Sequence, residues 1–109
     1  MAEDQYIIKE ILPKYYNLVK SEFDVVRFVL YGSYAYGKPH KDSDIDVAIV
    51  INPKKNKNII EIGKRLFSLA NLVDIRIEPN CYFKKELDEA EPASILAYIM
   101  KHGKEIKVN

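Results

Sequence analysis

Two seven-residue runs of β-branched and aromatic residues constrain the fold of this chain more than any other feature. They span residues 25–31 and 45–51. The first run stops at Gly32 and the second at Asn52-Pro53, and such residues punctuate strands. Each run therefore predicts a buried strand.

Further elements are predicted around these two runs. Apolar residues at offsets of three and four predict a helix from Asp4 to Phe23, which Pro13 should kink or split. The remaining segments are a helix at 58–70, a third strand at 72–77, a helical turn near 84–89, a helix at 93–102 ended by Gly103, and an edge strand at 104–108. This order predicts a two-layer α+β fold, with a small mixed sheet of about three to five strands and helices mainly on one face.

Size and composition favour a single domain over residues 1–109 of a cytoplasmic protein. Hydrophobic residues make up 48% of the 109 positions and charged residues 30%, as in ordinary globular proteins. The 17 basic and 16 acidic side chains nearly balance, so nucleic acid is not expected as the direct substrate. We expect no signal peptide and no membrane span, and the lone Cys81 is expected to fill a turn rather than act as a nucleophile.

The polar segment between the two runs begins with Gly32-Ser33. A glycine at the end of a strand lets the backbone approach a ligand, because it has no Cβ. If a helical turn starts at Ser33, its unpaired backbone N–H groups can bind phosphate oxygens. The segment therefore predicts a phosphate-binding turn.

The same segment ends with Asp44-Ile45-Asp46. Residues i and i+2 of a strand point to the same side, so the two carboxylates should share one face while Ile45 points into the core. Two neighbouring carboxylates repel each other unless a cation lies between them. Mg²⁺ suits such a pair, because it binds a few carboxylates together with water and substrate phosphates.

Asp74 is the candidate third carboxylate. It lies inside the predicted strand at 72–77, where a buried charge is costly unless it is paired or bound to metal. Together with Asp44 and Asp46 it would complete a site for two-metal phosphoryl transfer. An ion pair with Arg76 or Arg65 is the alternative explanation of Asp74.

These motifs resemble the signature of the DNA polymerase β superfamily of nucleotidyltransferases, and the whole chain resembles its minimal, MNT-type members. The matching residues are Gly32-Ser33, Gly37, Ser43-Asp44-Ile45-Asp46, Asp74 and the closing segment 95–106. The resemblance implies a nucleotidyltransferase fold and ATP or another nucleoside triphosphate as substrate. It also implies that Gly32, Ser33, Gly37 and Ser43 bind the nucleotide, and that Asp44, Asp46 and Asp74 are catalytic and hold two Mg²⁺ ions. Asp74 would also be the base for the acceptor hydroxyl.

The resemblance further implies a partner protein. Minimal members pair with an all-helical HEPN-type protein as antitoxin and toxin, and they transfer AMP from ATP to a tyrosine of that partner. A non-catalytic antitoxin that neutralises its partner by binding, through residues such as Tyr98 and Met100, is the main alternative. Transfer to a small molecule is a weaker alternative because no second domain is expected, and self-association of the chain stays open.

A P-loop overlaps the same segment but is rejected. Residues 32–38 fit its first seven positions, yet the eighth must be Ser or Thr and is Pro39, which also interrupts the helix that a P-loop needs. Other side chains nearby are expected to be structural or stay undecided. Structural positions are expected for His40 in a solvated loop, for His102 at a helix C-terminus, and for Lys54, Lys55 and Lys57 in another solvated loop. Tyr34 and Tyr36 beside the turn are left open between packing and a nucleotide contact, and Lys38 and Lys41 are left open as triphosphate contacts.

Overall fold

A computed structural model describes residues 3–37, 43–54 and 58–107 of the chain. The helices are α1 (Glu3–Tyr6), the π-helical segment η1 (Ile7–Ile11), α2 (Leu12–Glu22), α3 (Ser33–Tyr36), α4 (Ile59–Val73), α5 (Lys84–Asp88) and α6 (Ile95–His102). The strands are β1 (Val25–Tyr31), β2 (Ile45–Ile51), β3 (Ile77–Phe83) and β4 (Lys104–Glu105). The predicted positions of the first two strands are confirmed residue by residue.

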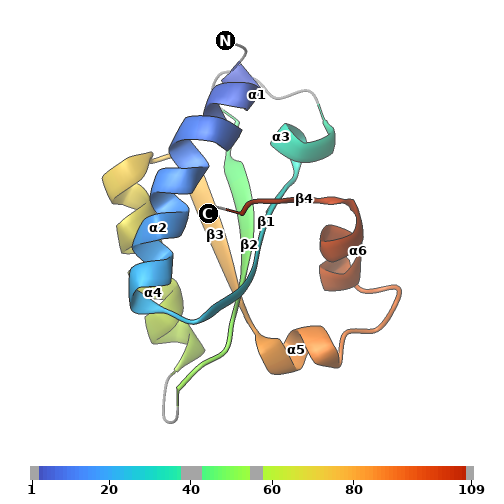
Figure 1. The fold of residues 1–109 in the computed structure, drawn as a ribbon. Coiled ribbons are helices and arrows are strands. Elements are labelled where there is room, and N and C mark those ends of the chain that lie inside the picture. Colours follow the sequence, from blue (N-terminus) through green and yellow to red (C-terminus); the bar gives the residue numbers. More distant parts are fainter. Residues whose placement is uncertain (1–2, 38–42, 55–57, 108–109) are drawn as a thin grey trace.

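The strands form one mixed four-stranded sheet in the order β3-β2-β1-β4 (Figure 1). β1 pairs antiparallel with both β2 and β4, whereas β2 pairs parallel with β3. Strand β3 therefore forms one edge, and it contains Pro79, a residue that sheets tolerate mainly at edges because it has no N–H to donate. The predicted α+β fold with a small mixed sheet is confirmed.

The predicted third strand at residues 72–77 is wrong, because those residues form the end of α4 and the connection to β3. Helix α4 continues to Val73, and the strand begins only at Ile77. The apolar Leu72 and Ile75 suggested a buried strand, but their side chains are 75% and 83% exposed. The Pro79-Asn80 pair, predicted to end the strand, lies within it.

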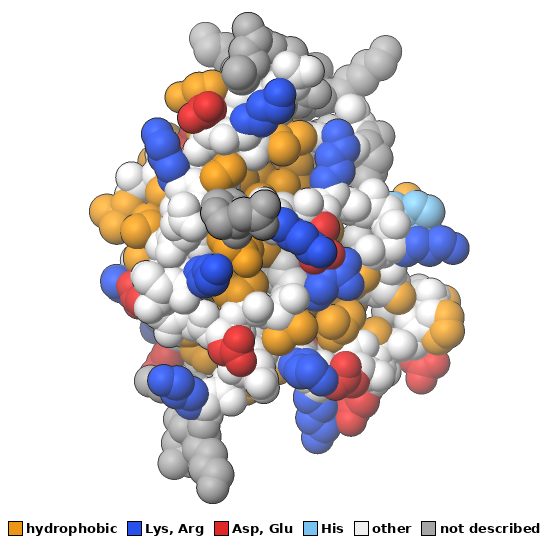
Figure 2. Space-filling model, in the orientation of Figure 1, with side chains coloured by type: hydrophobic (Ala, Val, Ile, Leu, Met, Phe, Trp, Pro, Cys, Tyr) orange, Lys and Arg blue, Asp and Glu red, His pale blue; other side chains and the backbone are white. Residues whose placement is uncertain are grey.

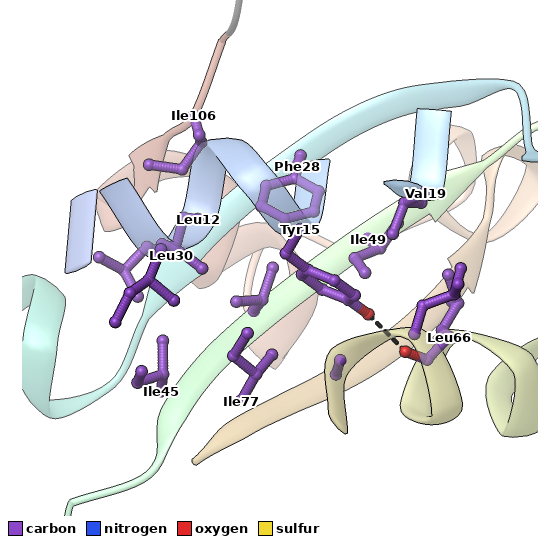
Figure 3. Packing of buried hydrophobic residues seen from close by; sticks show 14 of the residues in the cluster. Leu12, Tyr15, Val19, Phe28, Leu30, Ile45, Ile49, Leu66, Ile77 and Ile106 are labelled. Carbon is purple, nitrogen blue, oxygen red and sulfur yellow. Dashed lines mark hydrogen bonds between the residues drawn. The ribbon is translucent and has the colours of Figure 1, made fainter. Parts of the chain in front are cut away.

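The main hydrophobic core lies between one face of the sheet and the layer formed by η1, α2 and α4. Tyr15 of α2 is completely buried there, and its ring packs edge-on against Phe28 of β1 at 5.7 Å between centroids (Figure 3). The Tyr15 hydroxyl donates a hydrogen bond to the Leu66 carbonyl oxygen of α4 at 2.8 Å. One buried side chain thus ties the two helices and the sheet together.

The opposite face of the sheet is covered only in part, by α6. Buried Val29, Ala48 and Ile99 form a small second cluster there. Gly103 ends α6, as predicted, but with an ordinary φ of −72° rather than a left-handed one. A Cβ at Gly103 would overlap the Val29 side chain and lie 2.7 Å from the Ile99 carbonyl oxygen, so glycine is required by close packing of α6 on β1.

The N-terminal helix is continuous from Glu3 to Glu22, so the chain is not split at Pro13, and a π-helical segment lies just before that residue. The π-helical segment η1 ends directly before α2, where the Leu12 N–H donates to the Ile7 carbonyl oxygen. Pro13 follows in the first turn of α2 and cannot donate a backbone N–H. Among the residues that the structure describes, no helix combines the length and the apolar character needed to cross a bilayer.

Candidate active site

The connection from β1 to α3 turns sharply at Gly32. Its φ of 75° and ψ of −152° lie in a region that only glycine adopts without strain. A Cβ at this position would overlap the Asp46 carboxylate oxygen Oδ2. Glycine here therefore serves two purposes: it allows the turn, and it lets the backbone lie directly against the Asp46 carboxylate.

Helix α3 is a single turn that starts at Ser33, as the sequence predicted. The Gly37 N–H closes this turn by donating to the Ser33 carbonyl oxygen at 3.0 Å. A Cβ at Gly37 would lie 3.1 Å from the Ser33 Cα, so a small residue keeps the turn tight. Tyr34 is only 3% exposed and belongs to the main core, which favours packing over a nucleotide contact, the two roles that the sequence left open.

Asp46 is the second residue of β2 and lies directly opposite Tyr31 of β1. Asp44 is exposed and lies two residues earlier, just before the strand. Partial burial raises the pKa of Asp46 above its ordinary value, and the negative charges of Asp44 and Glu78 raise it further. The site therefore concentrates negative charge around one half-buried carboxylate.

Glu78 is a site residue that the sequence analysis missed. In the parallel pairing of β2 and β3, Glu78 is the partner of Asp46. Paired residues of neighbouring strands point to the same face, so Asp46 and Glu78 stand side by side. The sequence signal is the apolar Ile77 followed by the polar Glu78, an alternation typical of a strand with one buried face. It can be recognised only when the strand is known to start at Ile77.

Asp74 lies outside β3, at the C-terminal end of α4, and its carboxylate is held by Arg76. The Arg76 side chain donates two hydrogen bonds to it, at 3.1 Å to Oδ1 and 2.9 Å to Oδ2, and the Arg76 N–H donates a third at 2.8 Å. The hydrogen bonds from the Arg76 side chain are the main cause that lowers the pKa of Asp74 below its ordinary value. The ion pair considered as the alternative explanation is therefore present, with Arg76 and not with Arg65, which pairs with Glu22.

A hydrogen-bonded side-chain pair crosses the same sheet face next to the carboxylates. The Asn80 amide group on β3 donates through Nδ2 to the Tyr31 hydroxyl oxygen on β1. Between them lies Ala48 of β2, which pairs with Asn80 and is completely buried. A small residue at this position leaves room for the Tyr31 side chain to extend across β2.

The remaining predicted residues have simpler positions. Ser43 is half-buried directly before Asp44, and His102 packs its ring against Tyr98 in the last turn of α6. Cys81 lies in β3 rather than in a turn, and its burial raises the thiol pKa to about 11, which argues against a nucleophile. The expectations for Lys38, Pro39, His40, Lys41, Lys55 and Lys57, and for the Tyr36 side chain, fall outside the described residues.

The donors on this face fit a hard divalent cation that keeps much of its own coordination shell. Asp44, Asp46 and Glu78 supply carboxylate oxygens, and their mutual repulsion would be relieved by a cation. Within residues 3–37, 43–54 and 58–107, however, no group of three or more acidic, His or Cys side chains is close enough to hold a metal alone. That arrangement suits Mg²⁺, which usually combines one or two carboxylates with water and substrate phosphates.

The carboxylate face is open rather than enclosed. A cavity of about 360 Å³ lies elsewhere, at the far end of β2, and is lined by residues such as Glu22, Asn52 and Arg65. Arg65 is held there by Glu22 through two hydrogen bonds, at 2.6 and 2.7 Å. On the face visible in Figure 2, acidic and basic side chains are interspersed, in keeping with the net charge of +1.

A mixed sheet whose first two strands hold a Gly-Ser turn against an Asp-x-Asp pair is the architecture of nucleotidyltransferases. Residues 8–107 match the model of the nucleotidyltransferase domain family, and the chain belongs to this family. The resemblance inferred from the motifs is thereby confirmed.

Relatives of known name agree with this assignment. The chain is 38% identical over 82 residues to "Putative protein adenylyltransferase MJ0141" of Methanocaldococcus jannaschii, which covers 72% of this chain and 78% of the relative. It is 28% identical over 89 residues to "Putative protein adenylyltransferase MJ1379" of the same organism, covering 75% and 89%. The fold is similar to the crystal structure of a "putative nucleotidyltransferase" from Sulfolobus solfataricus, with a TM-score of 0.59, 22% identity and coverage of 79% and 76%.

Proposed function

We propose that this protein transfers a nucleoside monophosphate, AMP from ATP, to a hydroxyl group of a partner protein. One observation carries the proposal: Asp46 lies directly between the Gly32 backbone and Glu78, with Asp44 on the same side. This arrangement places a carboxylate cluster beside a turn that can bind phosphate.

Each side of the site has its own task in this proposal. The turn residues Gly32 and Ser33, together with Ser43, bind the triphosphate through backbone N–H groups and hydroxyls, and Gly37, whose N–H is used inside the turn, keeps the turn closed. Asp44 and Asp46 would hold Mg²⁺, and Glu78 stands beside Asp46 as a third carboxylate of the site. Bound Mg²⁺ supplies charge neutralisation and lowers the pKa of the attacking hydroxyl.

The transfer itself exchanges one phosphorus–oxygen bond for another. The acceptor oxygen forms a bond to the α-phosphorus, and the bond between the α-phosphorus and the bridging oxygen breaks, so pyrophosphate leaves with the electron pair. The acceptor's proton passes to a carboxylate base. We assign that base to Glu78 rather than Asp74, because Asp74 is engaged by three hydrogen bonds from Arg76.

A tyrosine of a HEPN-type helical protein, with this chain as the antitoxin, is the acceptor we propose. Two relatives carry names that call them protein adenylyltransferases, and this supports a protein acceptor. The exposure of Asp44 and Glu78 also suits a macromolecular acceptor, because an open face admits a residue carried on another folded protein. We place the reaction in the cytoplasm, since the only cysteine of the chain is a thiol without a partner for a disulfide.

Label transfer from α-labelled ATP in the presence of Mg²⁺ tests the proposal. The wild-type chain should label a co-purified helical partner, and the Asp44→Asn and Asp46→Asn variants should label it at least about 100-fold more slowly. Equal labelling by the wild type and both variants would show that this face is not the active site. Neutralisation of the partner by unlabelled complex formation alone would favour the non-catalytic alternative.

A further inference from the structure

We propose that Asn80 binds the acceptor hydroxyl and that Tyr31 is the positioning residue that orients Asn80. This inference rests on the proposed function and adds to it the side from which the acceptor enters and the side chain that selects it. It starts from the Asn80–Tyr31 hydrogen bond, which the transfer chemistry described above does not use.

The chemistry of displacement fixes the side of entry. In phosphoryl transfer the attacking and leaving oxygens lie roughly in line on opposite sides of phosphorus. The proposed triphosphate-binding turn, Gly32-Ser33, follows β1, so pyrophosphate leaves on the β1 side of Asp46. The acceptor must then approach from the other side of Asp46, which is β3.

Strand β3 is suited to this approach because it is an edge strand of the sheet. Glu78 and Asn80 are both exposed and stand two residues apart on one face of the strand, about 7 Å from each other. The next residue on that face, Tyr82, is half-buried and packs on the cluster under α6. An acceptor that reaches Glu78 across the edge therefore comes close to Asn80 as well.

The hydrogen bond to Tyr31 uses one end of the Asn80 amide group and leaves the other end available. Asn80 uses Nδ2 to donate to the Tyr31 oxygen, so its Oδ1 points away from that bond. An amide oxygen accepts hydrogen bonds, and the group that an alcohol or phenol offers before transfer is an O–H donor. The pair thus selects acceptors that carry a hydroxyl and holds them beside Glu78, toward which the single O–H turns from Asn80 Oδ1 when its proton is transferred.

The position of Tyr31 is itself determined by its neighbours. Tyr31 packs against the cluster of Val29, Ala48 and Ile99, and it is the pairing partner of Asp46. Its ring is therefore fixed by apolar contacts on one side while its hydroxyl reaches β3. Removing only the hydroxyl should leave these ring contacts and change the Asn80 orientation.

Three variants and one matched control test the inference: Asn80→Ala, Tyr31→Phe, the double variant, and Asn71→Ala, which removes an exposed Asn of α4. Transfer from α-labelled ATP is measured at increasing concentrations of N-acetyltyrosinamide as acceptor. Binding of Mg²⁺ and the non-reactive analogue α,β-methylene-ATP is measured by calorimetry. Thermal unfolding checks that each variant is folded.

We expect Asn80→Ala to raise the acceptor KM on the order of tenfold, which is the effect of losing one or two hydrogen bonds. The Kd of the ATP analogue should not change. Tyr31→Phe should raise the acceptor KM about threefold, and the double variant should be no worse than Asn80→Ala, because Tyr31 acts through Asn80. Asn71→Ala should match the wild type.

The inference is overturned if Asn80→Ala leaves the acceptor KM unchanged, or if it weakens analogue binding instead. Additive losses in the double variant would overturn the positioning role of Tyr31. In each of these outcomes the wild-type protein still transfers label, so the proposed function is not contradicted. A wild type that neither binds the analogue nor transfers label would instead refute the proposed function, and this inference with it.

Discussion

The two faces of the central sheet have opposite physical characters. On the face under α2 and α4, the strands present side chains such as Phe28, Ile49 and Ile77, which are at most 1% exposed. On the other face the same strands present Asp46 and Glu78, and only part of it is covered by α6. The strict two-residue alternation of the strands creates this separation.

The difference teaches how so short a chain can carry a charged site. Apolar burial on the helix-covered face provides the stability, since packed apolar side chains dominate the free energy of folding. The open face is then free to hold Asp46, whose pKa is raised first by partial burial and then by the negative charges of Asp44 and Glu78. We therefore expect substitutions on the two faces to change different properties.

The largest expected effect separates Glu78 from Asp74. Glu78→Gln should lower the transfer rate on the order of 10²- to 10⁴-fold with little change in thermal stability, because it removes the proposed base. Asp74→Asn should lower the rate less than about threefold, since Arg76 already occupies that carboxylate. Label transfer measures the rate of both variants. A larger loss of rate in Asp74→Asn than in Glu78→Gln would identify Asp74, and not Glu78, as the third carboxylate of the site.

On the helix-covered face, Leu66→Ala should lower the free energy of unfolding by about 2 to 5 kcal/mol, because it leaves a cavity in the main core. The transfer rate of the folded variant should stay close to that of the wild type below its melting temperature. Phe67→Ala is the control, since Phe67 is the next residue of α4 and is 48% exposed. Equal losses of stability in denaturant titrations would contradict the assignment of the core.

Gly32 affects both the stability of the fold and the position of Asp46, so its substitution should change both the free energy of unfolding and the transfer rate. Gly32→Ala should cost about 1 to 3 kcal/mol of stability from its backbone conformation and should slow transfer at least about tenfold, because the Cβ displaces Asp46. Gly63→Ala is the control: its Cβ has no atom within 4 Å, and in the middle of α4 it should stabilise by about 0.5 to 1 kcal/mol. A Gly32→Ala variant with wild-type activity would show that the turn does not need to contact Asp46.

The smallest expected effect is a pH-dependent gain of stability in Asp46→Asn. The pKa of Asp46 is raised in the folded state, so its ionised form destabilises the fold once the pH exceeds the ordinary Asp value. Below that value both states are protonated and the contribution vanishes. Without divalent cations, Asp46→Asn should therefore melt above the wild type at pH 7, and at the same temperature at pH 3.

The melting temperatures of the wild type and Asp46→Asn can also be compared with Mg²⁺ added. It should raise the melting temperature of the wild type more than that of Asp46→Asn, because the carboxylate that it would neutralise is absent from the variant. An Asp46→Asn variant that melts below the wild type at pH 7 would show that the carboxylate is stabilised by the fold rather than strained by it.

Much of this architecture could be predicted from local patterns. The limits of β1 and β2 were predicted to the residue because each β-branched run ends at a strand-breaking residue, Gly32 or Asn52-Pro53. Helix α6 and its closing Gly103 were also recognised, although the reason for the glycine is its contact with β1. These features depend on short-range preferences that a sequence shows directly.

The third strand was misplaced because composition cannot distinguish an exposed apolar helix end from a buried strand. Leu72, Val73 and Ile75 have the residue types of a strand, yet α4 continues to Val73, and of the three only Val73 packs against the main core. The true strand contains a proline and two polar residues, and it is recognisable only as the parallel partner of β2.

The sequence alone thus determined the family, the Gly32-Ser33 turn and the Asp44–Asp46 pair, because these lie within one continuous segment whose spacing sets their geometry. The tertiary structure is what favours Glu78 over Asp74 as the third carboxylate that we propose. The register of β3 against β2 places Glu78 beside Asp46, and the end of α4 leaves Asp74 to Arg76. The pairing of Glu78 with Asp46 joins residues more than thirty positions apart, which spacing along the chain does not encode.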